Sequence, residues 1–302
     1  MQLHGSITAL ATPFASSGAL DIAAWRTLVA WQVEAGTQGL IVAGSTGEAA
    51  MLSDAEFSEL IQSATGVVGG RVPVLAGAGL SGTEKALSQC LRALDAGADG
   101  VLVVTPPYVR PTQDGLRHHY ETLADALDAP LILYNVPSRT GVDLLPETVA
   151  MLAPHPRIVG IKEAVSDPAR MAALLPLRTP GFAILSGDDG SACEALSSGA
   201  DGVVSVVSNA IPAAFRHLCD LARTGDAEAA RALDAELSPL YATMGLEPNP
   251  IPVKAVLAAL GRCHDRLRLP LLPLSSRFRP EVEAALGLFR AVEARFGPGR
   301  AS

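Results

Sequence analysis

One lysine of this chain closes an apolar segment, which makes its amine a candidate for chemistry. The segment Ile158–Lys162 has the composition of a buried strand, and Lys162 shares the strand parity of Gly160 and Ile158, so its ammonium should point inward. Partial removal from water favours the neutral amine, which is a nucleophile toward a carbonyl carbon. The segment therefore predicts Schiff-base chemistry at Lys162; a strand-end lysine paired with Glu163 or with solvent is the alternative.

A tyrosine and an arginine stand where the preceding predicted strand ends. Tyr134 shares the parity of Ile132 in the segment Leu131–Asn135, so its phenol is expected at the same opening as Lys162, where it could donate or accept a proton. Arg139 lies in the loop just beyond and offers a planar fork for a carboxylate. A packing role for the tyrosine and a surface position for the arginine are the alternatives.

Two hydroxyl groups lie between glycines in a third segment, Gly44-Ser45-Thr46-Gly47-Glu48. This segment follows another apolar run and precedes a helix with Ser53 as its predicted N-cap. Exposed backbone N–H groups and short hydroxyls in such a turn suit a carboxylate or a phosphate. An ordinary glycine-rich turn is the alternative, and a P-loop is excluded because no lysine follows Gly47.

The three groups together predict a class I aldolase-type reaction on a 2-oxo acid. In this hypothesis the lysine forms the imine, the turn holds the carboxylate and the tyrosine moves protons. The residues alone do not name a second substrate.

Eight short apolar runs must position these groups. They are nearly continuous in apolar residues rather than alternating, which is typical of strands buried on both faces. Segments with helical spacing lie between them, such as Ile22–Ala35, Asp54–Gly66, Thr83–Ala96 and Gln113–Leu127. The eight predicted strands are Ile7–Ala11, Gly39–Ala43, Val72–Gly77, Gly100–Thr105, Leu131–Asn135, Ile158–Lys162, Phe182–Ser186 and Gly202–Val207.

A joint with two glycines precedes three of these runs, at residues 36–39, 97–100 and 199–202. The first glycine suits the left-handed position after a helix, and the second allows a helix and a strand to pack closely. The repeat predicts an α/β fold, a (β/α)₈ TIM barrel, with a doubly wound open sheet as the alternative. Four further helices are predicted: Ala213–Thr224, Glu228–Met244, Pro252–Leu260 and Pro280–Arg295. We therefore expect a barrel with the active site at residues 1–224 and a C-terminal helical domain at residues 225–302.

Composition excludes several classes of protein. With 49% hydrophobic and 18% charged residues, the 302-residue chain is not disordered, and a net charge of −8 without a basic run argues against nucleic acid or an anionic membrane as a partner. No apolar run is long enough for a bilayer span, and the start has no signal-peptide pattern. The four cysteines, Cys90, Cys193, Cys219 and Cys263, are far apart. They predict reduced thiols in a cytoplasmic protein without a metal site, and the Schiff-base hypothesis requires no cofactor.

Several motifs, in order along the chain, resemble those of the pyruvate-dependent Schiff-base lyase and aldolase family. The resemblance runs from the first predicted strand to about Leu274. It rests on Ala11-Thr12-Pro13-Phe14, Gly44–Glu48, Thr105-Pro106-Pro107-Tyr108, Tyr134–Gly141, Gly160–Glu163, Leu185–Asp189 and Glu247–Lys254.

This resemblance implies a catalytic set of four residues. Lys162 matches the lysine that forms the imine with pyruvate, and Tyr134 matches the tyrosine that donates and relays protons. Ser45 and Tyr108 match the other hydroxyl groups of the proton relay. In the family the second tyrosine comes from a neighbouring subunit, and the common assembly is a homotetramer built as a dimer of tight dimers.

The resemblance also implies the substrates. Thr46 matches the residue that holds the pyruvate carboxylate, with Val204 and Gly187 completing that subsite, and Arg139 matches the arginine that receives the carboxylate of L-aspartate 4-semialdehyde. The expected reaction is the condensation of these two compounds in the diaminopimelate route to lysine. N-acetylneuraminate lyase and other 2-oxo-acid aldolases remain alternatives, although Arg139 favours a second carboxylate. A non-catalytic sensor of 2-oxo acids is the alternative from another class.

The sequence departs from the family pattern at two places. Ser45 stands where a threonine is common, which keeps the hydroxyl, and Pro107 stands where a tyrosine often precedes the relay tyrosine. In lysine-inhibited members the amino acid binds His, Asn and Glu side chains, whose positions match Asp54, Phe57, Ser81 and Lys85. Because Lys85 would repel an ammonium, we expect weak or absent inhibition by lysine.

Overall fold

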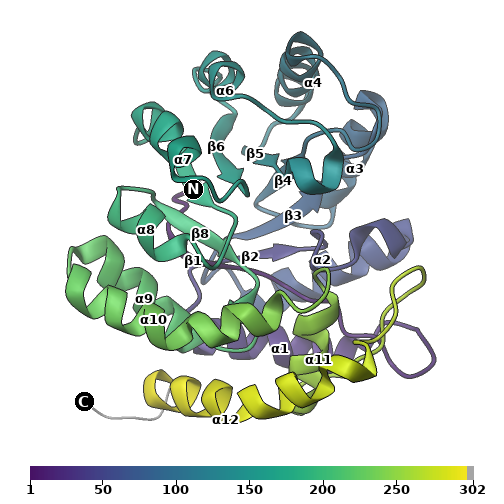
Figure 1. The fold of residues 1–302 in the computed structure, drawn as a ribbon. Coiled ribbons are helices and arrows are strands. Elements are labelled where there is room, and N and C mark those ends of the chain that lie inside the picture. The colour runs from purple at the N-terminus through teal and green to yellow at the C-terminus, as the bar shows by residue number, and fades with distance from the viewer. Residues whose placement is uncertain (298–302) are drawn as a thin grey trace.

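Eight parallel strands close into a barrel in the computed structural model of the chain, which describes residues 1–297. Their order around the barrel is that of the sequence, and β1 pairs with β8. Figure 1 shows the strands at the centre with helices around them. The strands are β1 (Gly5–Ala9), β2 (Gly39–Val42), β3 (Val74–Ala78), β4 (Gly100–Val104), β5 (Leu131–Asn135), β6 (Ile158–Glu163), β7 (Ala183–Ser186) and β8 (Gly202–Ser205). The predicted (β/α)₈ barrel is confirmed, and the open sheet is excluded.

Twelve α-helices within residues 1–297 cover the barrel and extend beyond it. They are α1 (Ile22–Glu34), α2 (Asp54–Val68), α3 (Thr83–Asp95), α4 (Gln113–Ala126), α5 (Pro137–Thr140), α6 (Pro146–Leu152), α7 (Pro168–Leu174), α8 (Ala192–Ser197), α9 (Pro212–Thr224), α10 (Ala227–Met244), α11 (Ile251–Ala259) and α12 (Arg279–Phe296). Short 3₁₀ turns occupy Ala49–Met51, Leu175–Leu177, Val207–Asn209 and Ser276–Phe278. None of the helices in this part of the chain is both long and apolar enough to cross a bilayer.

Two predicted local signals are confirmed. Ser53 caps α2, and its hydroxyl and the Glu56 carboxylate form a reciprocal capping box. Gly97, the first glycine of one repeated joint, has a φ of +95°. The second glycine, Gly100, serves a different close approach from the predicted helix–strand packing. A Cβ there would lie 2.8 Å from the carbonyl oxygen of Pro130, which precedes β5, so only glycine fits.

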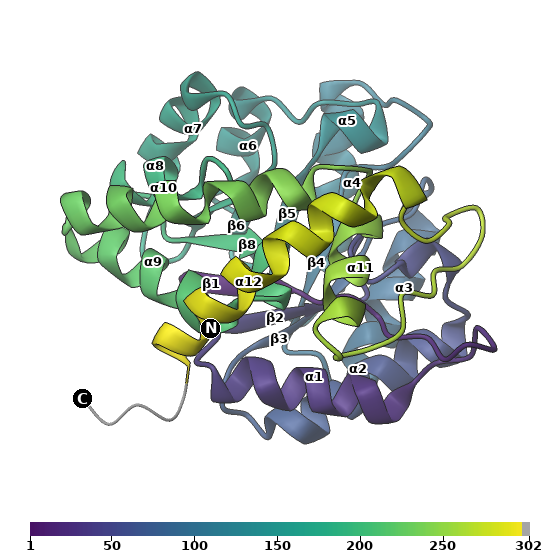
Figure 2. The ribbon, with the colours of Figure 1, turned by 60° about the horizontal axis from the view of Figure 1, so that its bottom comes forward.

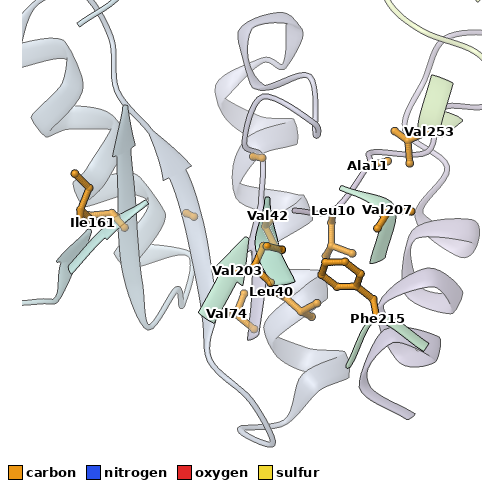
Figure 3. Close-up of a cluster of buried hydrophobic side chains, with 14 of the residues drawn as sticks. Leu10, Ala11, Leu40, Val42, Val74, Ile161, Val203, Val207, Phe215 and Val253 are labelled. Carbon is orange, nitrogen blue, oxygen red and sulfur yellow. The ribbon is translucent and has the colours of Figure 1, made fainter. Parts of the chain in front are cut away.

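Strand side chains alternate between the barrel interior and a layer beneath the helices. On β2, Ile41 joins the inner cluster, whereas Leu40 and Val42 pack in the outer one. Figure 3 shows part of the outer cluster, to which α9 and α11 contribute Phe215 and Val253. Since both faces of each strand are buried, the near-continuous apolar runs of the sequence are explained.

The parity predicted for β6 is wrong at its first residue. Leu131 pairs with Ile158, but Ile132 pairs with Gly160, so the register between β5 and β6 shifts by one residue. Ile158 consequently belongs to the outer cluster, while Val159 packs against the inner one. The parity holds beyond the irregularity, which keeps the end of β6 facing the interior.

The C-terminal helices form one group with α9 beside the barrel, as Figures 1 and 2 show. Helix α12 packs against α9, α10 and α11. The predicted boundary at residues 224 and 225 falls at the end of α9, where Gly225 is the helix C-cap with a φ of +89°. The boundary as a division into domains stays a prediction.

Arg268 fastens the segment between α11 and α12 to α2. Its guanidinium makes two hydrogen bonds to the Glu56 carboxylate, at 2.7 and 2.5 Å, and it also donates to the Gly18 and Met51 carbonyl oxygens. Hydrogen bonding to Arg268 lowers the pKa of Glu56 from 4.5 to about 2. The C-terminal segment thus docks through a largely shielded ion pair.

We predict that Glu56→Gln removes an acid-sensitive part of the stability. Glutamine can still cap α2, so the variant isolates the charge pairing with Arg268. A depressed carboxyl pKa stabilises the fold above pH 4.5 and loses that effect as the pH falls toward 2, with a magnitude on the order of 2 kcal/mol. Melting temperatures of wild type and variant should therefore differ at neutral pH and converge in acid. Glu59→Gln, at an exposed position of α2, is the control. A difference in melting temperature between wild type and Glu56→Gln that stays constant at all pH values would contradict the prediction.

Candidate active site

Lys162 and Tyr134 lie side by side at the carboxyl ends of neighbouring strands. The register pairs their Cα positions on β6 and β5. The Lys162 Nζ lies 4.3 Å from the centroid of the Tyr134 ring, and the two residues are 6% and 8% exposed. Among residues 1–297 no carboxylate lies within ion-pair distance of this ammonium. The aromatic face is therefore its stabilising neighbour, which leaves the amine available for reaction.

Glu163, the alternative partner of Lys162, is committed elsewhere. Its carboxylate accepts hydrogen bonds from the Asn135 amide at 3.1 Å and from the Val165 N–H at 2.8 Å, and Arg170 lies 3.5 Å away. Burial raises the pKa of Glu163, and the hydrogen bonds and Arg170 act against that rise. Because successive side chains of a strand point to opposite faces, Glu163 cannot reach the interior that Lys162 occupies. The hypothesis of a Lys162–Glu163 pair is wrong.

Gly187, directly after β7, completes the wall beside the lysine. Its N–H donates to the Glu163 carbonyl oxygen at 2.6 Å, which holds the two strand ends together. A Cβ at this position would lie 2.9 Å from the Lys162 Cε and 3.0 Å from the Glu163 carbonyl oxygen. Glycine is required here because any side chain would displace the lysine.

Residues of the C-terminal segment hold the glycine-rich turn after β2 in place. Thr46 is buried, and its Oγ1 accepts a hydrogen bond of 2.9 Å from the Asn249 side-chain amide. Glu48 has a φ of +57°, and its buried carboxylate bonds the Lys254 Nζ at 2.8 Å and the Arg268 N–H at 3.0 Å. Burial lowers the pKa of Lys254, and the charge of Glu48 opposes this shift. This ion pair fixes a left-handed residue two positions from Thr46.

Arg139 lies at the rim, on the short helix α5. Its guanidinium is exposed and donates to the Asn249 carbonyl oxygen at 2.8 Å. Thr46 and Arg139, predicted from two distant motifs, thus meet the same residue of the C-terminal segment. A free edge of the fork remains available to an anion at the mouth.

Two predicted relay residues are not joined to the others within one chain. Ser45 is exposed, and Tyr108 is 91% exposed with a strained φ of +74°. The Tyr108 N–H donates to the Thr140 carbonyl oxygen at 3.1 Å, so its loop is anchored to α5. In the described part of the chain neither side chain makes a hydrogen bond to Tyr134.

The loop after β8 is fixed by a half-buried carboxylate. Val204, a predicted substrate contact, is buried in the inner cluster. Just beyond it, the Asp189 carboxylate accepts hydrogen bonds from the Val206 N–H at 3.1 Å and the Val207 N–H at 2.8 Å. Burial raises the pKa of Asp189 to about 6. The backbone following Val204 is therefore held in one place.

Sequence reasoning missed the residues that support the site. Asn249 and Lys254 belong to the motif Glu247–Lys254 that carries the resemblance, but neither lies at the end of a predicted strand, where the sequence places the chemistry. Their signal was a polar Asn and a Lys inside a proline-rich apolar segment. No group of three or more His, Cys, Asp or Glu residues within residues 1–297 is arranged to hold a metal ion.

The barrel and the amine at its mouth define the class of a (β/α)₈-barrel lyase. The sequence profile of the dihydrodipicolinate synthetase family matches residues 2–288, so the chain belongs to that family. A 4-hydroxy-tetrahydrodipicolinate synthase of Xanthomonas axonopodis pv. citri is 59% identical over 294 residues, or 97% of each chain.

Solved structures agree with this assignment. The chloride-inhibited dihydrodipicolinate synthase of Acinetobacter baumannii, in complex with pyruvate, has a TM-score of 0.93 at 41% identity and covers 96% of this chain and 99% of its own. The synthase of Cyanidioschyzon merolae with lysine bound has a TM-score of 0.91 at 35% identity, with 95% and 98% covered. Enzymes of this family use no external cofactor.

Proposed function

We propose that this chain condenses pyruvate with L-aspartate 4-semialdehyde, the reaction of a 4-hydroxy-tetrahydrodipicolinate synthase, in the diaminopimelate route to lysine. The observation that carries the proposal is the buried Lys162 amine, which rests on Tyr134 and has no carboxylate partner among the described residues. The names of relatives up to 59% identical support the choice of substrates. The catalytic roles given below to single residues are part of the proposal.

The first half of the reaction activates pyruvate. The Lys162 Nζ attacks C2 of pyruvate, and the C2 oxygen leaves as water after protonation, which gives an imine. Tyr134, in contact with this amine, is placed to supply and remove protons, with Ser45 and Tyr108 as further relay hydroxyls. Thr46 holds the pyruvate carboxylate, and Gly187 and Val204 leave room for the substrate beside the lysine.

The second half forms the carbon–carbon bond. Loss of a methyl proton converts the imine to an enamine, whose carbon attacks the aldehyde carbon of the second substrate. The amino group of that substrate then replaces Lys162 at C2, which closes the ring and releases the lysine. Arg139 at the rim binds the carboxylate of the semialdehyde.

The exposed Tyr108 supports assembly into tight dimers and a homotetramer. A tyrosine that is 91% exposed on a strained backbone gains little within its own chain, and Val109 beside it is also exposed. A neighbouring subunit would cover this pair and receive the phenol in its own active site. A biosynthetic enzyme of this kind, with its cysteine thiols free, is expected in the cytoplasm.

Borohydride reduction in the presence of pyruvate tests the proposed function. The wild type should gain the mass of a reduced pyruvate adduct at Lys162, and Lys162→Ala should gain none.

Tyr134→Phe should slow turnover by roughly 10²–10⁴-fold, the range for loss of a proton-transfer group. A coupled assay that compares turnover of L-aspartate 4-semialdehyde with turnover of N-acetylneuraminate distinguishes the synthase from the lyase. Absence of an adduct in the wild type would contradict every Schiff-base hypothesis, including that of a sensor that only stores an imine.

Hybrid dimers test the placement of Tyr108. Co-expression of Lys162→Ala with Tyr108→Phe should restore activity above that of either variant, because each hybrid dimer holds one site with both groups intact. If Tyr108 served the site of its own chain, no hybrid site would be complete and activity would stay low. Each variant alone provides the control.

We predict that lysine inhibits weakly or not at all. Asp54 pairs with Arg92 at 2.7 Å, the Ser81 hydroxyl donates to the Pro107 carbonyl oxygen at 2.9 Å, and Phe57 is buried. None of these leaves a free carboxylate to attract an ammonium, and Lys85 is exposed and positive.

Activity titrations with L-lysine measure this. The wild type should retain its activity at concentrations far above micromolar, whereas Lys85→Glu, which removes the repelling charge, should become more sensitive. Half-inhibition of the wild type by micromolar lysine would refute the argument.

A further inference from the structure

Asn249 is the one residue within residues 1–297 that forms hydrogen bonds to both Thr46 and Arg139. It lies in the loop between α10 and α11, outside the barrel strands. Two different groups make the two contacts. The side-chain amide donates to the Thr46 Oγ1 at 2.9 Å, and the backbone carbonyl oxygen accepts from the Arg139 Nη2 at 2.8 Å.

The direction of the Thr46 contact has a chemical consequence. A threonine hydroxyl has one proton to donate and lone pairs to accept with. Because the Asn249 amide nitrogen is the donor, it engages a lone pair of the Thr46 oxygen and leaves the hydroxyl proton unused. In the described structure Thr46 Oγ1 makes no other hydrogen bond. The free proton is the group that a substrate carboxylate needs.

The oxygen of the Asn249 amide indicates that stability alone does not set the orientation of this side chain. Asn249 Oδ1 is buried and has no hydrogen-bond partner among the described residues. A buried acceptor without a partner is unfavourable, so the orientation of this amide needs an explanation other than the satisfaction of its own polar atoms. Among the described residues, the amide forms one side-chain hydrogen bond, the one to Thr46.

We propose that Asn249 is a positioning residue that keeps the Thr46 hydroxyl proton directed at the pyruvate carboxylate. Its backbone carbonyl separately restrains Arg139. This inference deepens the proposed function and rests on it. Since the two contacts come from different parts of Asn249, a side-chain substitution removes the first and spares the second.

The test measures pyruvate binding and aldehyde binding separately in the full-length enzyme. In Asn249→Ala the pyruvate concentration for half-maximal borohydride trapping should rise roughly threefold to tenfold, as for loss of one hydrogen bond, with the KM for the semialdehyde nearly unchanged. Asn249→Asp, whose carboxylate captures the Thr46 proton and repels the substrate, should weaken pyruvate binding further, by roughly a hundredfold. If Asn249→Ala does not fold, Asn249→Ser removes the same donor.

A double-mutant cycle with Thr46→Val decides whether the effect passes through Thr46. The proposal expects Asn249→Ala to add almost nothing in the Thr46→Val background. Glu247→Ala, which breaks the contact of the same loop with Ser275, is the matched control and should leave pyruvate binding unchanged.

Three outcomes are decisive. The inference is overturned if the effects in the cycle are additive, or if Glu247→Ala weakens pyruvate binding as much as Asn249→Ala does. It is also overturned if the KM for the semialdehyde rises as much as that for pyruvate. If the wild type itself traps no pyruvate, the proposed function fails first, so the two failures are distinguishable.

Discussion

The Lys162 amine is held at the mouth of a packed barrel without a carboxylate partner among residues 1–297, and the rest of the site depends on this constraint. Burial of an unpaired charge is unfavourable, so its surroundings must be specific. The register between β5 and β6 brings the Tyr134 ring to 4.3 Å from the Lys162 Nζ. Gly187 leaves space for the lysine Cε, and Glu163, the nearest acid in sequence, is held on the opposite face. Each of these features would be unnecessary for a lysine in water.

The barrel supplies the reactive groups, but the C-terminal segment fixes the turn that would receive a carboxylate. Lys254 and Glu48 form a fully buried pair, and removal of one partner of such a pair typically costs about 3–5 kcal/mol. A buried pair of this kind contributes little net stability, yet it permits one arrangement of the turn. Together with the largely shielded Arg268–Glu56 pair, it ties residues that follow the barrel to the turn after β2 and to α2. The C-terminal helices are in this sense part of the site.

Strand parity predicted Lys162 and Tyr134 because alternation is a local rule that the barrel enforces at every strand. The same rule was wrong at Ile158, since a register shift depends on how two strands pair rather than on either sequence. Asn249 contacts Thr46, which lies 203 positions earlier, and no periodicity connects residues so far apart. The exposure of Tyr108 is likewise outside the reach of local pattern, because it depends on which distant segments of the chain fold over its loop.

Two anionic substrates must approach a chain whose net charge is −8, and the surroundings of single acids bear on how they can. Three carboxylates that end or follow β2, β6 and β7 each have partners within the described chain. Glu48 is paired with Lys254, Glu163 accepts from Asn135, and Asp189 accepts backbone N–H groups. Neither Lys162 nor Arg139 has a carboxylate partner among residues 1–297, so both cationic groups are available to an anion at the mouth. Two anionic substrates can then approach an acidic protein, since the potential at a cleft follows the groups that line it rather than the net charge.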